Sequence, residues 1–239
     1  MSTSEKDAGS LEERVALLSR VSFLSELDGV TLGKLAARVT RRRVARGEPI
    51  CRDGQPCAGV WVVVEGSIQS VKAAPGGRLQ ILDTAGATGT CSLASALDGG
   101  SCPMQTEARV DSTVLLIPRD ALHEAAEQEP RLAMAIAKHL GSRLRGVTCQ
   151  LASLGLHDVR ARVAALLVEE AGRGVQAPDG SVKLRLPASQ AELAHRIGTE
   201  REVFARALKG LKEEGLIEQV RGRVSIRDLA GLRRVVDAP

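Results

Sequence analysis

The spacing of apolar residues changes twice along this chain, and the alternation limits the possible folds more than any other feature of the sequence. Apolar residues recur every three or four positions through residues 11–39, which predicts helix. Between residues 44 and 118, short Val- and Ile-rich runs alternate with glycine-containing turns such as Asp53-Gly54 and Glu65-Gly66. Short strands with a turn signal about every 8–12 residues predict an antiparallel β-roll or sandwich.

Helical spacing returns after Pro118 and continues to Leu154. Pro130 suits the first turn of a helix, because the N–H that proline lacks has no partner there. We expect a helix of about 24 residues, roughly 36 Å long. Its apolar stripe is narrow and heptad-like, which favours a seam between two copies of the chain; packing on its own domain is the alternative. The residues expected on the seam are Ile136, Leu140, Leu144, Val147 and Leu151.

Two short helices joined by a tight turn are predicted in the last third of the chain. Ser189 and Glu192 have the spacing of a capping box, in which the serine caps the helix and the glutamate reaches back. Gly198 permits a sharp turn, and Thr199 and Glu202 repeat the capping signature at the start of the second helix. This order is the pattern of a helix-turn-helix.

The flanking segments extend this pattern. An apolar helix is expected over residues 158–172, and residues 215–226 predict two short strands around Arg221-Gly222. Such a hairpin is the wing of a winged helix, and the combination is a stronger signal than either part alone. Arg221 and Arg223 can reach phosphates there, which positions a protein on DNA without selecting a sequence.

One face of the second helix carries residue types that read base edges. At about 100° per residue, a sector of about 140° contains Arg201, Glu202, Ala205, Arg206 and Lys209. Arginine can bond guanine O6 and N7 with two hydrogen bonds, and glutamate can accept from cytosine N4. The alternative is a solvated face, in which Glu202 only caps the helix and the arginines pair with nearby glutamates.

The composition limits the kinds of nucleic acid that the chain is expected to bind and the cellular compartment in which it is expected. The chain has three aromatic residues, Trp61, Phe23 and Phe204, so recognition of single-stranded nucleic acid by base stacking is disfavoured. From residue 157 onward, 15 Lys+Arg stand against 12 Asp+Glu, a mild excess that permits duplex DNA. No apolar run of about 18 residues predicts a membrane span, and the charged N-terminus is unlike a signal peptide. We expect a cytoplasmic protein whose five cysteines form no structural disulfides.

The chain resembles the Crp/Fnr family of transcription regulators over nearly all of residues 11–230. The motifs that carry the resemblance are Gly47-Glu48-Pro49-Ile50, Asp53-Gly54, Val60–Ile68, the Leu132–Leu154 helix and Arg201–Arg206. It implies an α+β fold with an antiparallel, jelly-roll-like β-roll. The domains it implies are a disordered N-terminus (1–10), a cyclic-nucleotide-binding-like sensory β-roll (11–128), a long dimerisation helix (129–156) and a winged helix-turn-helix (157–239).

The resemblance also implies a mode of action. A homodimer is expected on pseudo-palindromic duplex DNA, with half-sites about one helical turn apart. Arg201, Glu202 and Arg206 would read TGTGA-like half-sites. The expected phosphate contacts are Ser189, Gln190, Thr199, Lys209, Arg221 and Arg223. An activator of this kind would also contact RNA polymerase. A Cys-dependent enzyme is the weaker alternative, because no His lies near a Cys in a recognisable nucleophile motif.

The sensory pocket departs from the family pattern. Relatives that bind cyclic nucleotides carry a Glu for the ribose and an Arg for the cyclic phosphate, where this chain has Thr90 and Cys102. Without the arginine the phosphate charge is largely uncompensated, so we expect that cyclic AMP and cyclic GMP do not bind. The residues expected at the pocket are Gly89, Thr90, Cys91, Ser92, Cys102 and Thr148. A regulator without an effector, controlled by its abundance, is an alternative.

Four cysteines lie in or beside that pocket by the same resemblance: Cys51, Cys57, Cys91 and Cys102. Four thiols could hold an iron–sulfur cluster, and two that meet could form a redox-active pair. Their spacing matches no ferredoxin run, and cysteine is also a common core residue, so packing is the alternative. Haem held by His123, His139 or His157 is the weaker option. A redox or diatomic-gas signal is therefore the sensing hypothesis.

Overall fold

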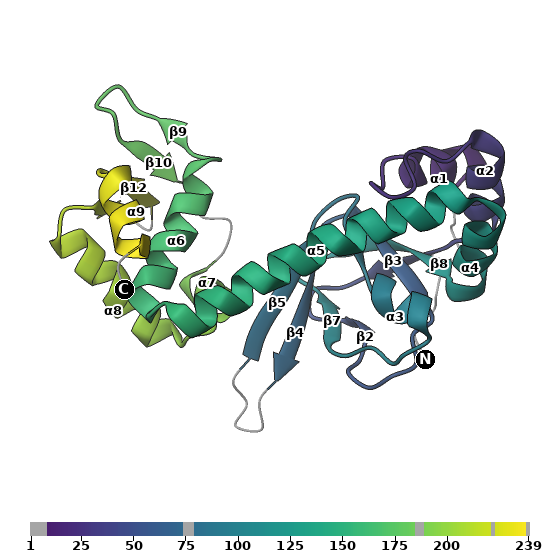
Figure 1. Ribbon diagram of the computed structural model, residues 1–239, viewed down its shortest axis with the longest axis horizontal. Helices are drawn as coiled ribbons and strands as arrows, with labels where there is room; N and C mark the ends of the chain where they lie inside the picture. The colour runs from purple at the N-terminus through teal and green to yellow at the C-terminus, as the bar shows by residue number, and fades with distance from the viewer. Residues whose placement is uncertain (1–8, 74–78, 185–188, 221–222, 238–239) are drawn as a thin grey trace. The chain divides into compact units, whose positions relative to one another are not determined.

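The computed structural model describes residues 9–73, 79–184, 189–220 and 223–237 (Figure 1). The chain divides into two compact units, Met1–Arg145 and Gly146–Pro239. Helices combined with antiparallel sheets in both units confirm the α+β class predicted from the sequence. None of the described helices is both long enough and apolar enough to cross a membrane.

Two capped helices begin the first unit. α1 (Leu11–Leu18) starts after Ser10, whose Oγ accepts from a first-turn N–H at 3.1 Å. α2 (Gly29–Arg38) starts after Asp28, whose carboxylate accepts from two first-turn N–H groups at 2.8 and 2.9 Å. These bonds satisfy donors that otherwise have no partner at a helix N-terminus, which fixes where both helices begin.

The strands described in the first unit form two four-stranded antiparallel sheets, which confirms the predicted β-roll. One sheet has the order β1-β8-β3-β6 and the other the order β2-β7-β4-β5. The bounds are β1 (Thr40–Val44), β2 (Pro49–Cys51), β3 (Gly59–Glu65), β4 (Ile68–Ala73), β5 (Leu79–Ala85), β6 (Thr90–Cys91), β7 (Gln105–Ala108) and β8 (Ser112–Pro118).

Side-chain alternation along β3 explains why the first sheet is buried on both faces. Val60 and Val62 pack into a core that the sheet shares with the helices. Trp61 and Val63, which point to the opposite face, pack in a second core with residues of the other sheet such as Ile68. The continuous apolar run that predicted this strand therefore packs in two cores, one on each face of the sheet.

The remaining helices of the first unit are α3 (Leu93–Asp98), α4 (Arg119–Gln128) and the part of α5 (Pro130–Leu156) that ends at Arg145. α5 has 27 residues, in line with the long helix predicted there. Its first turns pack on the β-roll, because Leu132 and Ile136 are 0% and 4% exposed and belong to the helical core. Ile136 was expected on a dimer seam, and the structure corrects this: its side chain is used inside its own domain.

The second unit surrounds Phe204, which is fully buried. Its elements are α6 (Val159–Ala171), β9 (Val175–Gln176), β10 (Val182–Leu184), α7 (Gln190–Arg196), α8 (Arg201–Glu213), β11 (Ile217–Val220), β12 (Arg223–Ile226) and α9 (Leu229–Asp237). The sheet has the order β11-β12-β10-β9. β9 was not predicted, because its two residues are both exposed and show no apolar alternation.

Candidate DNA interface and sensory cleft

The helix-turn-helix is present where the sequence predicted it. Ser189 Oγ accepts from the N–H of Glu192 at 3.3 Å, and the Glu192 carboxylate accepts from the N–H of Ser189 at 2.7 Å. This reciprocal capping box starts α7. At the other end of α7, Gly198 has φ +70°, a left-handed conformation that glycine adopts without steric cost and that lets the chain reverse into α8.

The second capping box, predicted at Thr199 and Glu202, is wrong. The N–H of Thr199 is bonded to the carbonyl of Ala194 at 2.9 Å, which draws this residue into the turn and leaves it 8% exposed. Glu200 becomes the N-cap of α8 and makes no side-chain cap bond. Glu202 is therefore not a capping residue, and Thr199, expected at a phosphate, is a buried turn residue.

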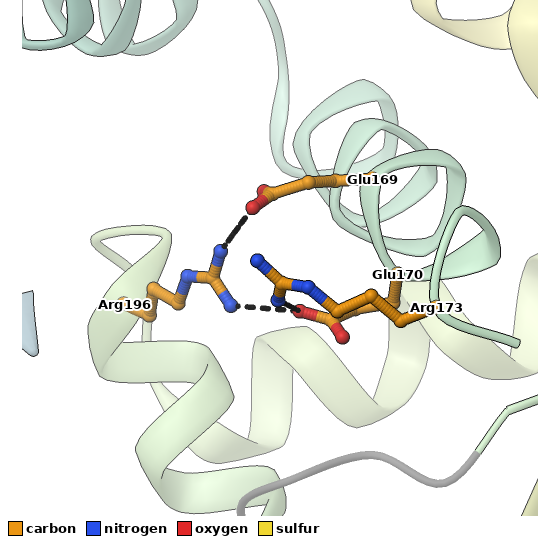
Figure 2. Close-up of polar contacts among 4 residues, drawn as sticks. All are labelled: Glu169, Glu170, Arg173 and Arg196. Atoms are coloured by element: carbon orange, nitrogen blue, oxygen red, sulfur yellow. Dashed lines mark hydrogen bonds and ion pairs between the residues drawn. The ribbon is translucent and has the colours of Figure 1, made fainter. Parts of the chain in front are cut away.

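Side chains of α6 hold α7 and the turn in place. Arg196 lies between two carboxylates of α6, at 2.8 Å from Glu169 and 3.1 Å from Glu170 (Figure 2). Glu170 is 4% exposed and also pairs with Arg173 at 3.2 Å, so this buried charge has two cationic partners. Arg162 donates to the carbonyl of Ile197 at 2.8 Å, one residue before the glycine of the turn.

The outer face of α8 carries charged side chains, three of which have no partner among the described residues. Phe204, Leu208 and Leu211 anchor the helix in the core of the unit. The three residues predicted to read bases are all exposed: Arg201, Glu202 and Arg206. Their side chains make no hydrogen bond or ion pair with any residue that the structure describes.

The neighbouring cation of that face has a partner of its own. Lys209 pairs with Glu213 at 3.4 Å, an exposed contact of the helix with itself. Glu213 was one of the acids that could have neutralised the arginines of the face. Because it serves Lys209 instead, Arg201 and Arg206 remain available to a ligand outside the chain.

The remaining expected phosphate contacts lie around α8. Ser189 is exposed and Gln190 is partly exposed at the start of α7. Arg223 is exposed at the start of β12, where it pairs in register with Val220. Arg221 lies outside the residues that the structure describes.

An ion-pair cluster fixes the hairpins behind the wing. Arg227 pairs with Asp179 at 2.6 Å, and it donates from Nε to Glu218 at 3.0 Å. Hydrogen bonds from the hydroxyl and N–H of Ser181, followed by Arg227, lower the pKa of the Asp179 carboxyl to about 2. Asp179 lies in the turn between β9 and β10, Glu218 lies on β11, and Arg227 follows β12. The cluster therefore links the β9–β10 hairpin to the wing strands and stabilises the sheet that carries the wing.

The later part of α5 exposes an apolar stripe. Leu140 is half-buried against the helical core of the first unit. Leu144, Val147 and Leu151 are 67%, 49% and 64% exposed. At about 100° per residue they fall within about 60° of one another on the helix, in line with Leu140.

A cleft of about 320 Å³ opens in the first unit, and it differs from the pocket expected from the sequence. Its lining comprises the segment Thr84–Thr90 together with Arg20, Ser22, His139 and Arg143. Of the expected residues, Gly89 and Thr90 line it. Cys91, Ser92 and Cys102 are not part of its lining, and Thr148 lies on α5 in the second unit.

The cysteines gather around Ser92 instead. The sulfur of Cys51 lies 3.7 Å from Ser92 Oγ, Cys57 Sγ donates to the Ser92 carbonyl at 3.7 Å, and Ser92 Oγ donates to Cys91 Sγ at 3.8 Å. Burial raises the pKa of both the Cys91 and the Cys102 thiols to about 12, so they are protonated at neutral pH.

The described residues show no metal-binding arrangement around these thiols. All four are free, and no group of three or more His, Cys, Asp or Glu side chains among the described residues is arranged to hold a metal ion. The four residues therefore do not fit the iron–sulfur hypothesis.

Comparison with known proteins agrees with both halves of the chain. A profile described as a cyclic nucleotide-binding domain matches residues 41–129, and one described as a Crp-like helix-turn-helix domain matches residues 161–235. The chain is 30% identical over 194 residues to the transcriptional regulator LdrP of Thermus thermophilus, a match covering 81% of this chain and 95% of LdrP.

Two further relatives extend the match over more of the chain. A CRP-like cAMP-activated global transcriptional regulator of Mycobacterium tuberculosis is 24% identical over 218 residues, which cover 91% of this chain and 97% of that protein. The solved structure of FixK2 from Bradyrhizobium japonicum has a TM-score of 0.70 and 25% identity, covering 84% of this chain and 98% of that chain.

Proposed function

Because the chain belongs to the Crp/Fnr family of DNA-binding transcription regulators, we propose that it acts as a homodimer on a pseudo-palindromic duplex site. Arg201, Glu202 and Arg206 of each copy read one TGTGA-like half-site. The observation that carries this proposal is the outer face of α8, where these three charged side chains are exposed and have no partner among the described residues.

The chemistry of that face suits the major groove. The two arginines supply paired N–H donors for guanine O6 and N7, and Glu202 supplies an acceptor for cytosine N4. Ala205 lies between them with a side chain of one carbon, so the helix backbone can approach the bases. The expected phosphate contacts are made by Lys209, Arg223, Ser189 and Gln190. These contacts set the register of the protein on the duplex without reading its sequence.

The dimer forms through α5. An exposed stripe of Leu144, Val147 and Leu151 on one helix is costly in water, and a second copy of the same stripe covers it in a parallel coiled-coil seam. An isologous seam of this kind relates two α8 helices by a twofold axis, as a pseudo-palindromic site requires.

The signal is not a cyclic nucleotide bound through the cassette residues. Thr90 and Cys102 stand where charge recognition is needed, and they are 8% and 2% exposed and uncharged. A redox signal is the second candidate, because three thiols meet at Ser92. It would act on Cys51 and Cys57, the half-buried members of the cluster.

The first test is the specificity of DNA binding after Arg206→Ala. The probes are a duplex with two inverted TGTGA half-sites and a random duplex of equal length, in fluorescence anisotropy at fixed salt. Arg206→Ala removes the arginine–guanine contact from both half-sites, so at about 1–3 kcal/mol per contact it should cost about 2–6 kcal/mol on the specific duplex, or about 30-fold or more, and much less on the random one.

The matched control is Arg233→Ala, which removes the same charge from an exposed position on α9 of the same unit. It should weaken both duplexes little and equally. Equal losses on the two duplexes for Arg206→Ala, or no preference of the unmodified protein for the inverted repeat, would contradict the proposed base reading.

A further inference from the structure

The cleft of the first unit is built from three separate parts of the chain. The segment Thr84–Thr90 joins β5 to β6, Arg20 and Ser22 follow α1, and His139 and Arg143 lie one turn apart on α5. All belong to the same compact unit. Its volume of about 320 Å³ lies at the lower end of the range for pockets that hold small organic molecules.

The charged side chains that line the cleft are arginines. Two arginines and a histidine line it, and no Asp or Glu is among the lining residues. Arg143 pairs with Asp83, which lies just outside the cleft. The side chain of Arg20 makes no hydrogen bond or ion pair with any residue that the structure describes, so this exposed lining arginine has no counter-charge there.

His139 adds an unsatisfied nitrogen. Its Nδ1 lies 3.2 Å from Ser22 Oγ, and the ring of Phe23 packs edge-on with centroids 5.4 Å apart, so the imidazole is held from two sides. Its Nε2 is buried and has no hydrogen-bond partner in the structure. Because this atom is closed off from the open space of the cleft, the imidazole acts as part of the wall and not as a donor to a ligand.

The backbone of the cleft is strained. Thr88 has φ +66°, a left-handed conformation that is rare for a β-branched residue. Two hydrogen bonds hold this segment against β3: the N–H of Thr88 donates to the carbonyl of Val63 at 2.8 Å, and the N–H of Val63 donates to the carbonyl of Gly89 at 2.9 Å. Strain of this kind persists where the surrounding structure over-determines it, which is typical of binding sites.

We propose that this cleft binds a small organic anion through its carboxylate or phosphate group. Arg20 supplies the uncompensated charge, its fork suits two oxygens of one oxyanion, and Arg143, whose charge is shared with Asp83, supplies further N–H donors. Ser22 holds the histidine ring in place through the contact between its Oγ and Nδ1. The site differs from the cyclic-nucleotide cassette, because its cations lie on Arg20 and α5, and it does not depend on the proposed DNA sequence.

The test is calorimetric titration of the full-length protein with citrate, inorganic phosphate and cyclic AMP, at an ionic strength held constant with chloride. We expect saturable binding of citrate or phosphate. Arg20→Gln should weaken it at least tenfold, whereas Arg52→Gln, an exposed arginine of the same unit outside the cleft, should leave it unchanged. The tighter of the two probes identifies the oxyanion class.

Each other outcome overturns part of the reasoning. No saturable binding of any probe, or equal weakening by Arg20→Gln and Arg52→Gln, would show that the cleft is not an anion site. Binding of cyclic AMP that depends on Arg20 would support the cleft and refute the proposed absence of cyclic-nucleotide sensing. A nuclear magnetic resonance titration of His139 gives an independent readout: its pKa should rise on saturation with the anion, and unchanged titration would refute an anion bound beside it.

Discussion

At the scale of single residues, the most consequential polar group of the second unit is a buried acid. Glu170 has its carboxylate almost fully inside the protein, while the side chains of its partners Arg196 and Arg173 are 33% and 70% exposed. The ion pair between Arg196 and Glu170 therefore links the exposed end of α7 to the buried face of α6. Removing the acid leaves two cations near a desolvated site, which is costlier than removing a surface partner.

We predict that Glu170→Gln destabilises α6 and α7 by about 1–3 kcal/mol. Hydrogen exchange of peptides covering residues 160–197 measures the effect. Glu169→Gln is the matched control, because it removes an exposed carboxylate from the same Arg196, and should cost no more than about 1 kcal/mol. Equal effects of the two variants would show that burial of Glu170 has no energetic role.

The thiols give a second prediction at this scale. For Cys91 and Cys102, burial raises the pKa from 9.0 to about 12, which lowers the thiolate fraction about a thousandfold at neutral pH. Both side chains are also buried, with 9% of Cys91 and 2% of Cys102 exposed. In the native protein, iodoacetamide should therefore alkylate Cys51 and Cys57 well before either of them.

Mass spectrometry of peptides after timed alkylation checks this order. In denaturant the four cysteines should react at similar rates, which controls for differences between the peptides. If Cys91 or Cys102 reacted as fast as Cys51 in the folded protein, the buried pair would be activated, and the redox hypothesis would shift to them.

At the scale of elements, the sequence predicted best where local chemistry alone decides. Ser189 and Glu192 bond to each other and Gly198 turns the chain, so α7 and its end could be placed from residues close in sequence. The capping box at Thr199 was predicted wrongly because the spacing of a serine or threonine three residues before a glutamate does not show whether its N–H is already bonded in a turn. The cleft could not be foreseen, since Arg20 and His139 meet only after α5 packs on the β-roll.

The apolar stripe of α5 gives the prediction at this scale. Leu144→Glu combined with Leu151→Glu should convert the dimer to a monomer, because four buried charges would face each other across the seam. Sedimentation velocity measures the change. The fold of each monomer should persist by circular dichroism, since both side chains are exposed within one chain.

Met134→Glu is the control for this variant. Met134 is 59% exposed on the same helix but lies about 80° or more around it from the stripe, so the dimer should remain. Leu140 is a poor choice for the test because it also packs in the core of the first unit. A double variant that still sedimented as a dimer would refute the seam.

At the scale of the whole molecule, function depends on two units with separate cores that share one helix. Residues of α5 up to Arg145 group with the β-roll, and those from Gly146 group with the winged helix. The proposed anion cleft is lined by His139 and Arg143, which precede Arg145. The exposed stripe begins at Leu144, at the end of the same part of α5. A ligand beside His139 and Arg143 therefore bears on the same helix that we propose to hold the dimer together.

The dependence of DNA affinity on salt tests the assembled dimer. Each phosphate contact contributes about 0.9 to the slope of log K against log salt, and a dimer makes every contact twice. Lys209→Gln should therefore make the slope shallower by about 1.8, because its exposed pairing with Glu213 is weak enough to yield to a phosphate. Lys34→Gln, which changes an exposed lysine of the first unit, should leave the slope unchanged.

The monomeric α5 variant gives a second readout. Its slope on a duplex with a single half-site should be about half the slope of the dimer on the full inverted repeat. An unchanged slope for Lys209→Gln would remove this lysine from the interface, and a full slope for the monomer would contradict two-copy binding.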